Sequence, residues 1–106
     1  MSQVTFVGES GKRYSFVIQP ITTLFKEVGA VYFITKRTID AVHTVTHNRI
    51  FVGATENLAK QFNSPKDPML LRFGANCICI HLEEDKKKRL KIESDLVGNY
   101  NPPGNS

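Results

Sequence analysis

The stretch AVYFIT at residues 30–35 is almost continuously apolar and directly follows Gly29. A short apolar run of this kind is typical of a strand that is buried on both faces. A second apolar run at residues 49–53 predicts a neighbouring strand. The residues between the two runs, 38–48, form a polar excursion with room for a short strand at residues 42–46. The two runs predict the centre of a sheet.

An N-terminal hairpin is expected before this centre. Residues 4–7 are β-prone, residues 8–11 have turn chemistry, and residues 13–19 alternate between apolar and polar side chains. Pro20 ends the second strand, because proline cannot donate to a ladder. The hairpin therefore spans residues 4–19, and residues 21–27 predict either a short helix or a turn.

Two helices and one more strand are expected after the centre. Thr55 is a suitable N-cap for a short helix, which the segment 64–68 would stop with its two prolines. The alternation of residues 75–82 predicts a strand, with Ile78 and Ile80 on one face. Residues 83–99 predict the longest helix, on which acids precede bases by four residues. The strand–strand–helix–strand–helix order indicates an α+β fold.

Composition excludes several classes of protein. The chain has 106 residues and 41% hydrophobic residues, which fits one globular domain and not a disordered or fibrous chain. The longest apolar run is far shorter than the roughly 18 residues of a membrane span. There is no secretory signal pattern and no disulfide framework, so we expect a single cytoplasmic domain over residues 1–106. The net charge, 14 − 10 = +4, permits a polyanionic partner without requiring one.

Glu93 interrupts the apolar face of the last expected helix. On a helical wheel it lies between Leu96 and Val97, and Arg89 lies on the same arc. A carboxylate at such a position must be paired, hydrated or bound to a cation, because burying it alone is costly. The pattern leaves two interpretations open: an Arg89–Glu93 salt bridge, or a metal-binding or catalytic carboxylate.

Four segments occur in an order that resembles the GIY-YIG endonuclease family, which includes the incision subunit of nucleotide excision repair. The order, spacing and closing Pro-x-x-Asn carry the resemblance over residues 29–105, which leaves the hairpin outside it. The segments are Ala30-Val31-Tyr32, residues 51–62 (FVGATENLAKQF), residues 92–97 (IESDLV) and Pro102-Pro103-Gly104-Asn105.

The resemblance implies a fold and a chemistry. The fold would be a small, mainly antiparallel central sheet flanked by helices. The chemistry would be the hydrolysis of DNA phosphodiester bonds with Mg²⁺ or Mn²⁺. Glu93 matches the family's metal-binding glutamate, Tyr32 the tyrosine that assists the attacking water, and Asn105 a terminal asparagine that we interpret as structural.

Three positions depart from the family pattern, and Ala30, which replaces a glycine of the first motif, matters less than the other two. Phe51 replaces a tyrosine, so that ring has no hydroxyl group. Gln61 replaces an arginine that would stabilise charge on the phosphoryl transition state. By comparison with the loss of one oxyanion donor, this change could cost about 2.7–4 kcal/mol, or 10²–10³ in rate. Lys60 is next to Gln61 but points about 100° away on a helix.

Other residue clusters have plain explanations as well as functional ones. The bases at residues 86–89 favour a solvated helix face over a phosphate track, and His43 and His47 favour exposed loop positions over a catalytic base. The Cys77-x-Cys79-x-His81 pattern favours half-buried strand residues over zinc, which usually needs a second pair of ligands.

The leading hypothesis is a metal-dependent, GIY-YIG-like DNA endonuclease, weakened at Phe51 and Gln61. The alternative is a catalytically inactive module of the same fold that binds nucleic acid or a protein. A third hypothesis is a subunit whose active site is completed by a partner chain.

Overall fold

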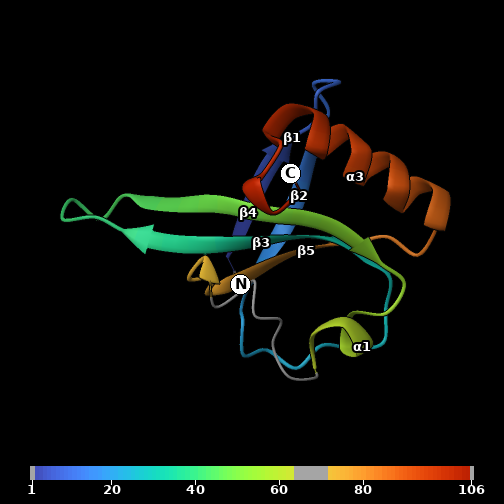
Figure 1. Cartoon of the computed structure of the whole chain (residues 1–106), viewed down its shortest axis with the longest axis horizontal. Coiled ribbons are helices and arrows are strands. Elements are labelled where there is room, and N and C mark those ends of the chain that lie inside the picture. The colour runs from blue at the N-terminus through green and yellow to red at the C-terminus, as the bar shows by residue number, and fades with distance from the viewer. Residues whose placement is uncertain (1, 64–71, 106) are drawn as a thin grey trace.

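A computed structural model describes residues 2–63 and 72–105. Within them, five antiparallel strands form one curled sheet in the order β1-β2-β5-β3-β4 (Figure 1). The strands are β1 (Gln3–Val7), β2 (Arg13–Pro20), β3 (Ala30–Ile39), β4 (Val45–Thr55) and β5 (Cys77–Leu82). The helices are α1 (Leu58–Phe62) and α3 (Lys86–Tyr100), followed by a 3₁₀ turn, η1 (Pro103–Asn105). The described chain is therefore a small α+β structure, as expected.

The predicted central strand is confirmed. β3 pairs with β4 on one side and with β5 on the other, and the N-terminal hairpin adds β1 and β2 beyond β5. Ala30, Val31, Phe33 and Thr35 are each 0% exposed, because both faces of β3 are covered.

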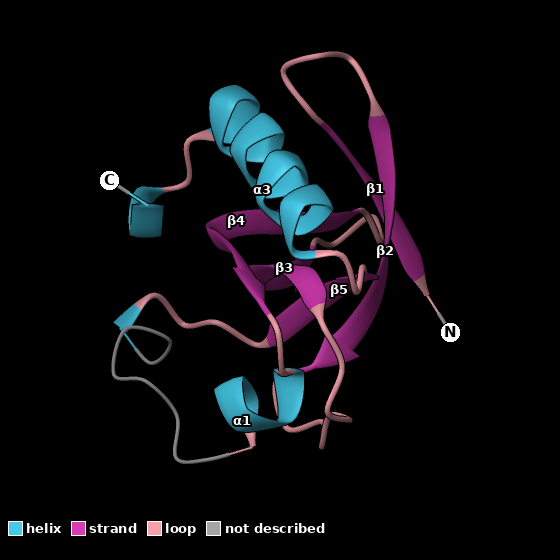
Figure 2. Cartoon of the chain, turned by 90° about the vertical axis from the view of Figure 1, so that its right-hand side faces the viewer, coloured by secondary structure: helices cyan, strands magenta, loops and turns pink. Residues whose placement is uncertain are grey.

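The two helices lie on opposite faces of the sheet (Figure 2). One face packs β3, β4 and β5 against α1 through Leu58 and Phe62. The other face packs the hairpin and β3 against Leu96 of α3, with Phe6, Phe16 and Phe33 in edge-on or tilted ring contacts. Burial of large apolar side chains on both faces is the main stabilising contribution.

The sequence suggested a loop for most of the polar excursion at residues 38–48. The structure shows two paired strands there instead. β3 and β4 continue as a two-stranded ribbon to the pair Ile39↔Val45, and only residues 40–44 form the turn. The ribbon has polar side chains near its base and β-branched ones (Thr38, Ile39, Val45 and Thr46) near its tip, and β-branched residues favour strands. The suggested strand at 42–46 is thus wrong in its start, since β4 begins at Val45.

Both predicted helix starts are also corrected. Asn57, not Thr55, is the N-cap of α1, while the Thr55 hydroxyl contacts the backbone of Asn57. α3 begins at Lys86 because the Asp85 carboxylate accepts the N–H groups of Lys87 and Lys88 as N-cap. The acids at residues 83–85 therefore precede the helix. The expected pairs between these acids and the bases four residues later are not pairs along a helix face. Residues 21–27 form a turn and loop without a helix, and the predicted stop at 64–68 lies outside the described residues.

Candidate active site at the outer edge of strand β4

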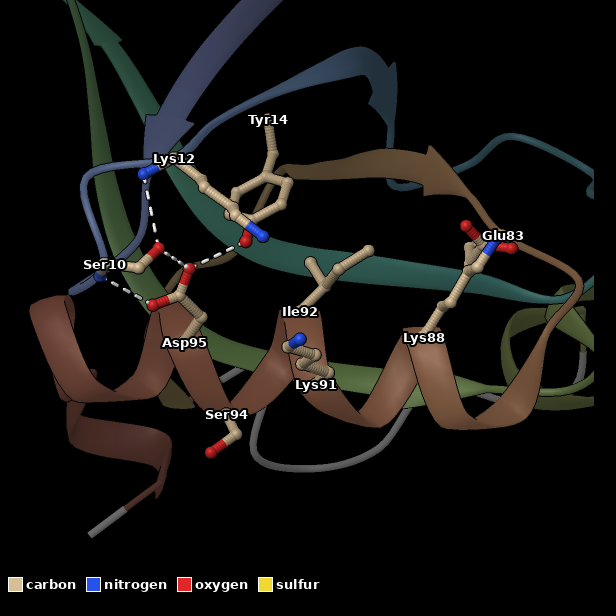
Figure 3. Close-up of a pocket in the computed structure, with 9 residues that line it drawn as sticks. All are labelled: Ser10, Lys12, Tyr14, Glu83, Lys88, Lys91, Ile92, Ser94 and Asp95. Carbon is tan, nitrogen blue, oxygen red and sulfur yellow. Dashed lines mark hydrogen bonds between the residues drawn. The ribbon is translucent and has the colours of Figure 1, made fainter.

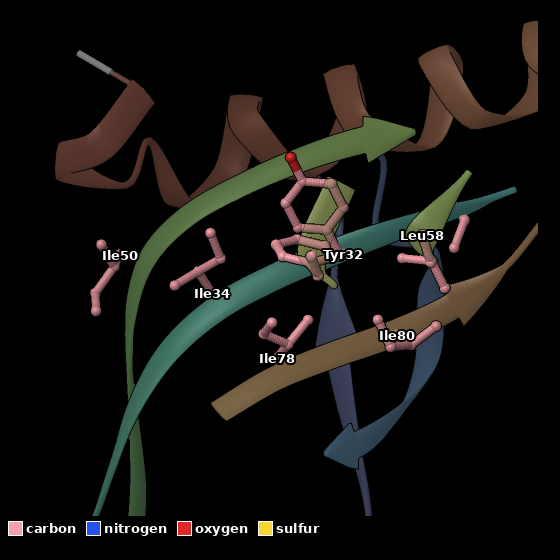
Figure 4. Packing of buried hydrophobic residues seen from close by; sticks show 8 residues of the cluster. Tyr32, Ile34, Ile50, Leu58, Ile78 and Ile80 are labelled. Atoms are coloured by element: carbon pink, nitrogen blue, oxygen red, sulfur yellow. The ribbon is translucent and has the colours of Figure 1, made fainter. Parts of the chain in front are cut away.

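Tyr32 crosses β4 at a glycine. It pairs with Gly53 in the antiparallel register of β3 and β4, and a Cβ added at Gly53 would lie 2.6 Å from the Tyr32 hydroxyl oxygen. Only glycine leaves room for this ring. The hydroxyl group points across β4 towards α3, away from the apolar cluster that holds the rest of the side chain (Figure 4).

Glu93 reaches the same edge of the sheet from α3. Its side chain is half-buried, and burial raises the pKa of its carboxyl group. The backbone N–H of Ala54 donates to that carboxylate and acts in the opposite direction. Ala54 follows Gly53, so the carboxylate lies next to the strand position that Tyr32 crosses.

The negative charge of Glu93 acts on the Tyr32 hydroxyl. Burial, together with the negative charge of Glu93, raises the pKa of Tyr32 to about 12. The Tyr32 side chain is only 5% exposed, so little water screens this interaction. The two residues that the sequence assigned to one site are therefore close enough in the fold to interact electrostatically, although 61 positions (93 − 32) separate them in the sequence.

The C-terminal segment closes the remaining part of this edge. The Asn105 side chain accepts the N–H of Val52 and donates to its carbonyl, both at 2.9 Å. Val52 and Ala54 present their outward backbone groups on one edge, because alternate strand residues do so. Asn105 thus takes the place of a sixth strand, in agreement with its interpretation as structural.

Arg89 does not form the salt bridge that the sequence left open. Its Nη1 donates to the carbonyl oxygens of Glu83 at 3.1 Å and Glu84 at 2.8 Å, and its side chain is 6% exposed. Arg89 therefore holds the loop before α3. Among the described residues, no hydrogen bond joins it to Glu93, and that interpretation of the apolar-face carboxylate is wrong.

Phe51 and Gln61, the two departures that affect the chemistry, lie in different surroundings. The Phe51 ring lies beside Tyr32, with 6.1 Å between the ring centroids. Gln61 lines a neighbouring hollow of about 330 Å³, together with Thr55, Glu56, Asn57 and Lys60. Lys60 thus faces the same hollow as Gln61, although a helical wheel separates them.

A smaller hollow joins this region to the start of α3. It has a volume of about 210 Å³ and shares Thr55 and Glu56 with the first hollow. Its other lining residues are Ala54, Lys86, Arg89 and Leu90. Sequence reasoning missed Glu56, Lys86 and the Ala54 N–H, since nothing in their local pattern shows that they line the end of β4.

The donor set suits one kind of metal ion. No cluster of three or more His, Cys, Asp or Glu side chains occurs within residues 2–63 and 72–105, so a cage made wholly of protein ligands is not formed there. Magnesium commonly keeps several waters and binds through one or two carboxylates plus substrate phosphate. Glu93, half-buried and with no basic partner in the part of the chain that the structure describes, fits that mode.

Comparison with protein-family models, with curated proteins and with solved structures found no match. The assignment of this site therefore depends on its own residues.

The histidines and cysteines lie elsewhere. His43 is in the ribbon turn, and the partly exposed His47 contacts the Thr35 hydroxyl at 3.0 Å, so the loop position expected for His47 is wrong. His47 is six residues from Gly53, or about 20 Å along β4.

Cys77 and Cys79 are buried in β5, and burial raises the pKa of the Cys79 thiol to about 12. These cysteines are ordinary strand residues, more deeply buried than expected.

A larger hollow of about 610 Å³ is lined by residues of the hairpin and of α3 (Figure 3). Asp95 on its wall accepts the N–H and hydroxyl of Ser10 and the hydroxyl of Tyr14. These hydrogen bonds hold the pKa of Asp95 below its usual value. Asp95 therefore fastens the hairpin to α3.

Neither α1 nor α3, the helices of the described chain, combines the length and the apolar character that crossing a bilayer requires.

Proposed function

We propose that this protein is a metal-dependent DNA endonuclease of the GIY-YIG type with weakened activity. The observation that carries the proposal is that the Tyr32 hydroxyl lies over Gly53 while the Glu93 carboxylate accepts the N–H of the next residue, Ala54, at the edge of β4. The antiparallel sheet, with its long C-terminal helix and the Asn105 contact, supports it as well.

Glu93 would hold the divalent ion, Mg²⁺ or Mn²⁺. Its raised pKa reflects a partly desolvated carboxylate, and a cation nearby favours the charged form. Such an ion, when bound, neutralises charge on a phosphate and lowers the pKa of its bound water. The Ala54 N–H fixes the orientation of the carboxylate.

Tyr32 would orient the attacking water as a neutral phenol. Because burial and the charge of Glu93 raise its pKa to about 12, Tyr32 stays protonated at neutral pH. The phenol therefore donates or accepts a hydrogen bond and does not act as a strong base. Because its ring is buried and fixed over Gly53, the hydroxyl is held in one direction.

The weakening is assigned to Phe51 and Gln61. Phe51 lies at the family's second tyrosine position, beside Tyr32, but its ring cannot form a hydrogen bond. Gln61 provides an amide where a guanidinium would give charge-assisted bonds to a phosphate. The Lys60 side chain in the same hollow offers partial replacement of that charge.

The same two residues favour a second candidate, a catalytically inactive module of this fold that binds nucleic acid or a protein. Such a module would keep the sheet and the Asn105 contact, since these stabilise the fold, while losing chemistry at positions 51 and 61.

Supercoiled plasmid separates the two functions. We expect the purified protein to nick it in Mg²⁺ or Mn²⁺, and we expect Glu93→Ala to abolish nicking. Glu27→Ala, at an exposed glutamate in the loop before β3, is the matched control and should nick like the wild type. Plasmid that stays intact with the wild type in both metals would reject the endonuclease proposal.

A further inference from the structure

We propose that the free end of the β3–β4 ribbon is an arm that docks in a groove of duplex DNA. The arm consists of residues 36–48, with the turn at residues 40–44. This inference rests on the proposed function only in taking DNA as the partner.

The arm leaves the sheet at Thr35. β5 pairs with β3 only as far as Thr35↔Cys77, whereas β3 and β4 pair on to Ile39↔Val45. Beyond Thr35 the ribbon therefore has no neighbouring strand within the described chain, and it projects from the rest of the molecule (Figure 1). Four residues, Lys36 to Ile39, give it a reach of about 13 Å.

The arm has a defined shape. At its turn the Asp40 carboxylate accepts the N–H groups of Val42 and Thr44, both at 2.9 Å, and His43 adopts a left-handed conformation with φ of 63°. At its base the Asn76 side chain bonds both backbone groups of Arg37. An isolated two-stranded hairpin is only marginally stable in water, so these bonds matter for keeping the arm extended.

The charges of the arm suit a polyanion. Lys36 and Arg37 are exposed, and Arg49 lies at its base with the guanidinium 4.3 Å from the centroid of the Tyr100 ring. Asp40 is the single acid in the range 36–49, and its carboxylate is occupied by the turn. Residues 36–49, which are the arm and Arg49 at its base, thus carry three bases and one acid. Their net charge per residue is higher than that of the whole chain.

The tip of the arm is apolar and uncovered. Ile39 is 52% exposed, Val45 is 46% exposed, and Val42 in the turn is 76% exposed. Ile39 and Val45 form a cross-strand pair on one face, the face that also carries Arg37 and His47. Apolar side chains at such a tip can contact thymine methyl groups in the major groove or wedge between base steps.

The combination favours duplex DNA over a protein partner. A two-stranded ribbon fits the major groove, which is about 12 Å wide, and bases beside it reach the phosphates that flank the groove. The tip and Tyr32 are seven residues apart on β3, or about 23 Å, which corresponds to about seven base pairs. We expect the arm to contact DNA at about that distance from the cleaved bond.

Binding of a fluorescent 24-base-pair duplex, measured by anisotropy in EDTA, tests the arm without cleavage. We expect the Lys36→Glu/Arg37→Glu variant to bind at least ~10-fold more weakly. The slope of log affinity against log salt concentration should become less steep by about two. Ile39→Ser/Val45→Ser should weaken duplex binding with the slope unchanged, since it removes no charge. The control is Lys26→Glu/Lys91→Glu, at exposed bases off the arm, which should bind nearly as the wild type does.

The outcomes separate the arm from the endonuclease. All variants should unfold at the wild-type temperature, because the arm is outside the core. If both arm variants bind duplex with the wild-type affinity and the wild-type salt dependence, the arm does not bind DNA, even if the protein nicks plasmid. Duplex binding that depends on the arm, in a protein that does not nick plasmid, would support DNA binding by the arm and reject the endonuclease proposal. No duplex binding at 50 mM salt, or equal binding to single strands, would also overturn the arm.

Discussion

Glu93 ionises under two opposing influences, burial and the Ala54 N–H, and burial is the larger. Its pKa in the folded protein is therefore above the unfolded value. A carboxyl group of this kind favours folding below its unfolded pKa, and this contribution is lost as pH rises through the folded pKa. At neutral pH the charged Glu93 thus destabilises the protein in the absence of a cation.

Glu93→Gln should therefore raise the free energy of unfolding at pH 7–8 in EDTA. The gain should vanish as the pH falls below the usual range of glutamate, where the wild-type carboxyl group is also neutral. Urea unfolding at several pH values measures both effects. Saturating Mg²⁺ should stabilise the wild type and not the variant, because a ligand that binds only the folded state stabilises it. A variant that is less stable than the wild type at pH 8 in EDTA would contradict this account of Glu93.

Gln61→Arg should raise the nicking rate, because a guanidinium adds a charged fork for the phosphate at the hollow of α1. We expect up to 10²–10³, the range for one transition-state donor. Gln61→Lys is the matched control for charge without the planar fork, and it should give a smaller gain. A Gln61→Arg rate equal to that of the wild type would mean that position 61 does not limit the reaction.

At the scale of elements, Arg89 connects the loop before α3 to the sheet. Its guanidinium bonds two carbonyl oxygens, and a Cβ added at Gly29 would meet Arg89 and the Glu83 carbonyl oxygen, so the start of β3 packs closely on this loop. Arg89→Leu would leave those carbonyls without partners. We expect a loss of about 2–4 kcal/mol in urea unfolding. Lys88→Leu, at the neighbouring exposed position, should change stability by less than about 0.5 kcal/mol.

Asn105 ties the C-terminal turn to β4. Asn105→Ala would expose the N–H and carbonyl of Val52 at the sheet edge, and we expect a loss of about 1–2 kcal/mol. Hydrogen exchange of the Val52 amide should accelerate more than exchange of Phe33 at the sheet centre. Unchanged protection of Val52 would show that the Asn105 bonds do not hold this edge.

At the scale of the whole molecule, hydrophobic periodicity predicted the hairpin, the central strand and the long helix. It could not predict the ribbon arm, because exposed strands lack the apolar alternation that marks buried ones. It also placed the start of α3 too early, since acids suit both the first turn and the N-cap of a helix.

The candidate site was predictable in part. Glu93 stood out as a carboxylate on an apolar face, and the motif order pointed to Tyr32. The Ala54 N–H, the glycine that lets Tyr32 cross β4 and the shared hollows depend on strand register, which a single sequence does not specify. The interpretation of Arg89 and Glu93 as a salt bridge was wrong because Arg89 bonds the carbonyl oxygens of the loop before α3. A helical wheel cannot represent such a tertiary contact.

In the proposed function, Tyr32 and Glu93 form a metal-dependent nuclease centre at the edge of β4. Its most direct test is plasmid nicking by the Phe51→Tyr/Gln61→Arg variant, which restores the family residues, with and without Glu93→Gln. We predict nicking faster than wild type in Mg²⁺ or Mn²⁺, and none once Glu93 is replaced. A folded restored variant that leaves the plasmid intact, or nicking that survives Glu93→Gln, would contradict the claim.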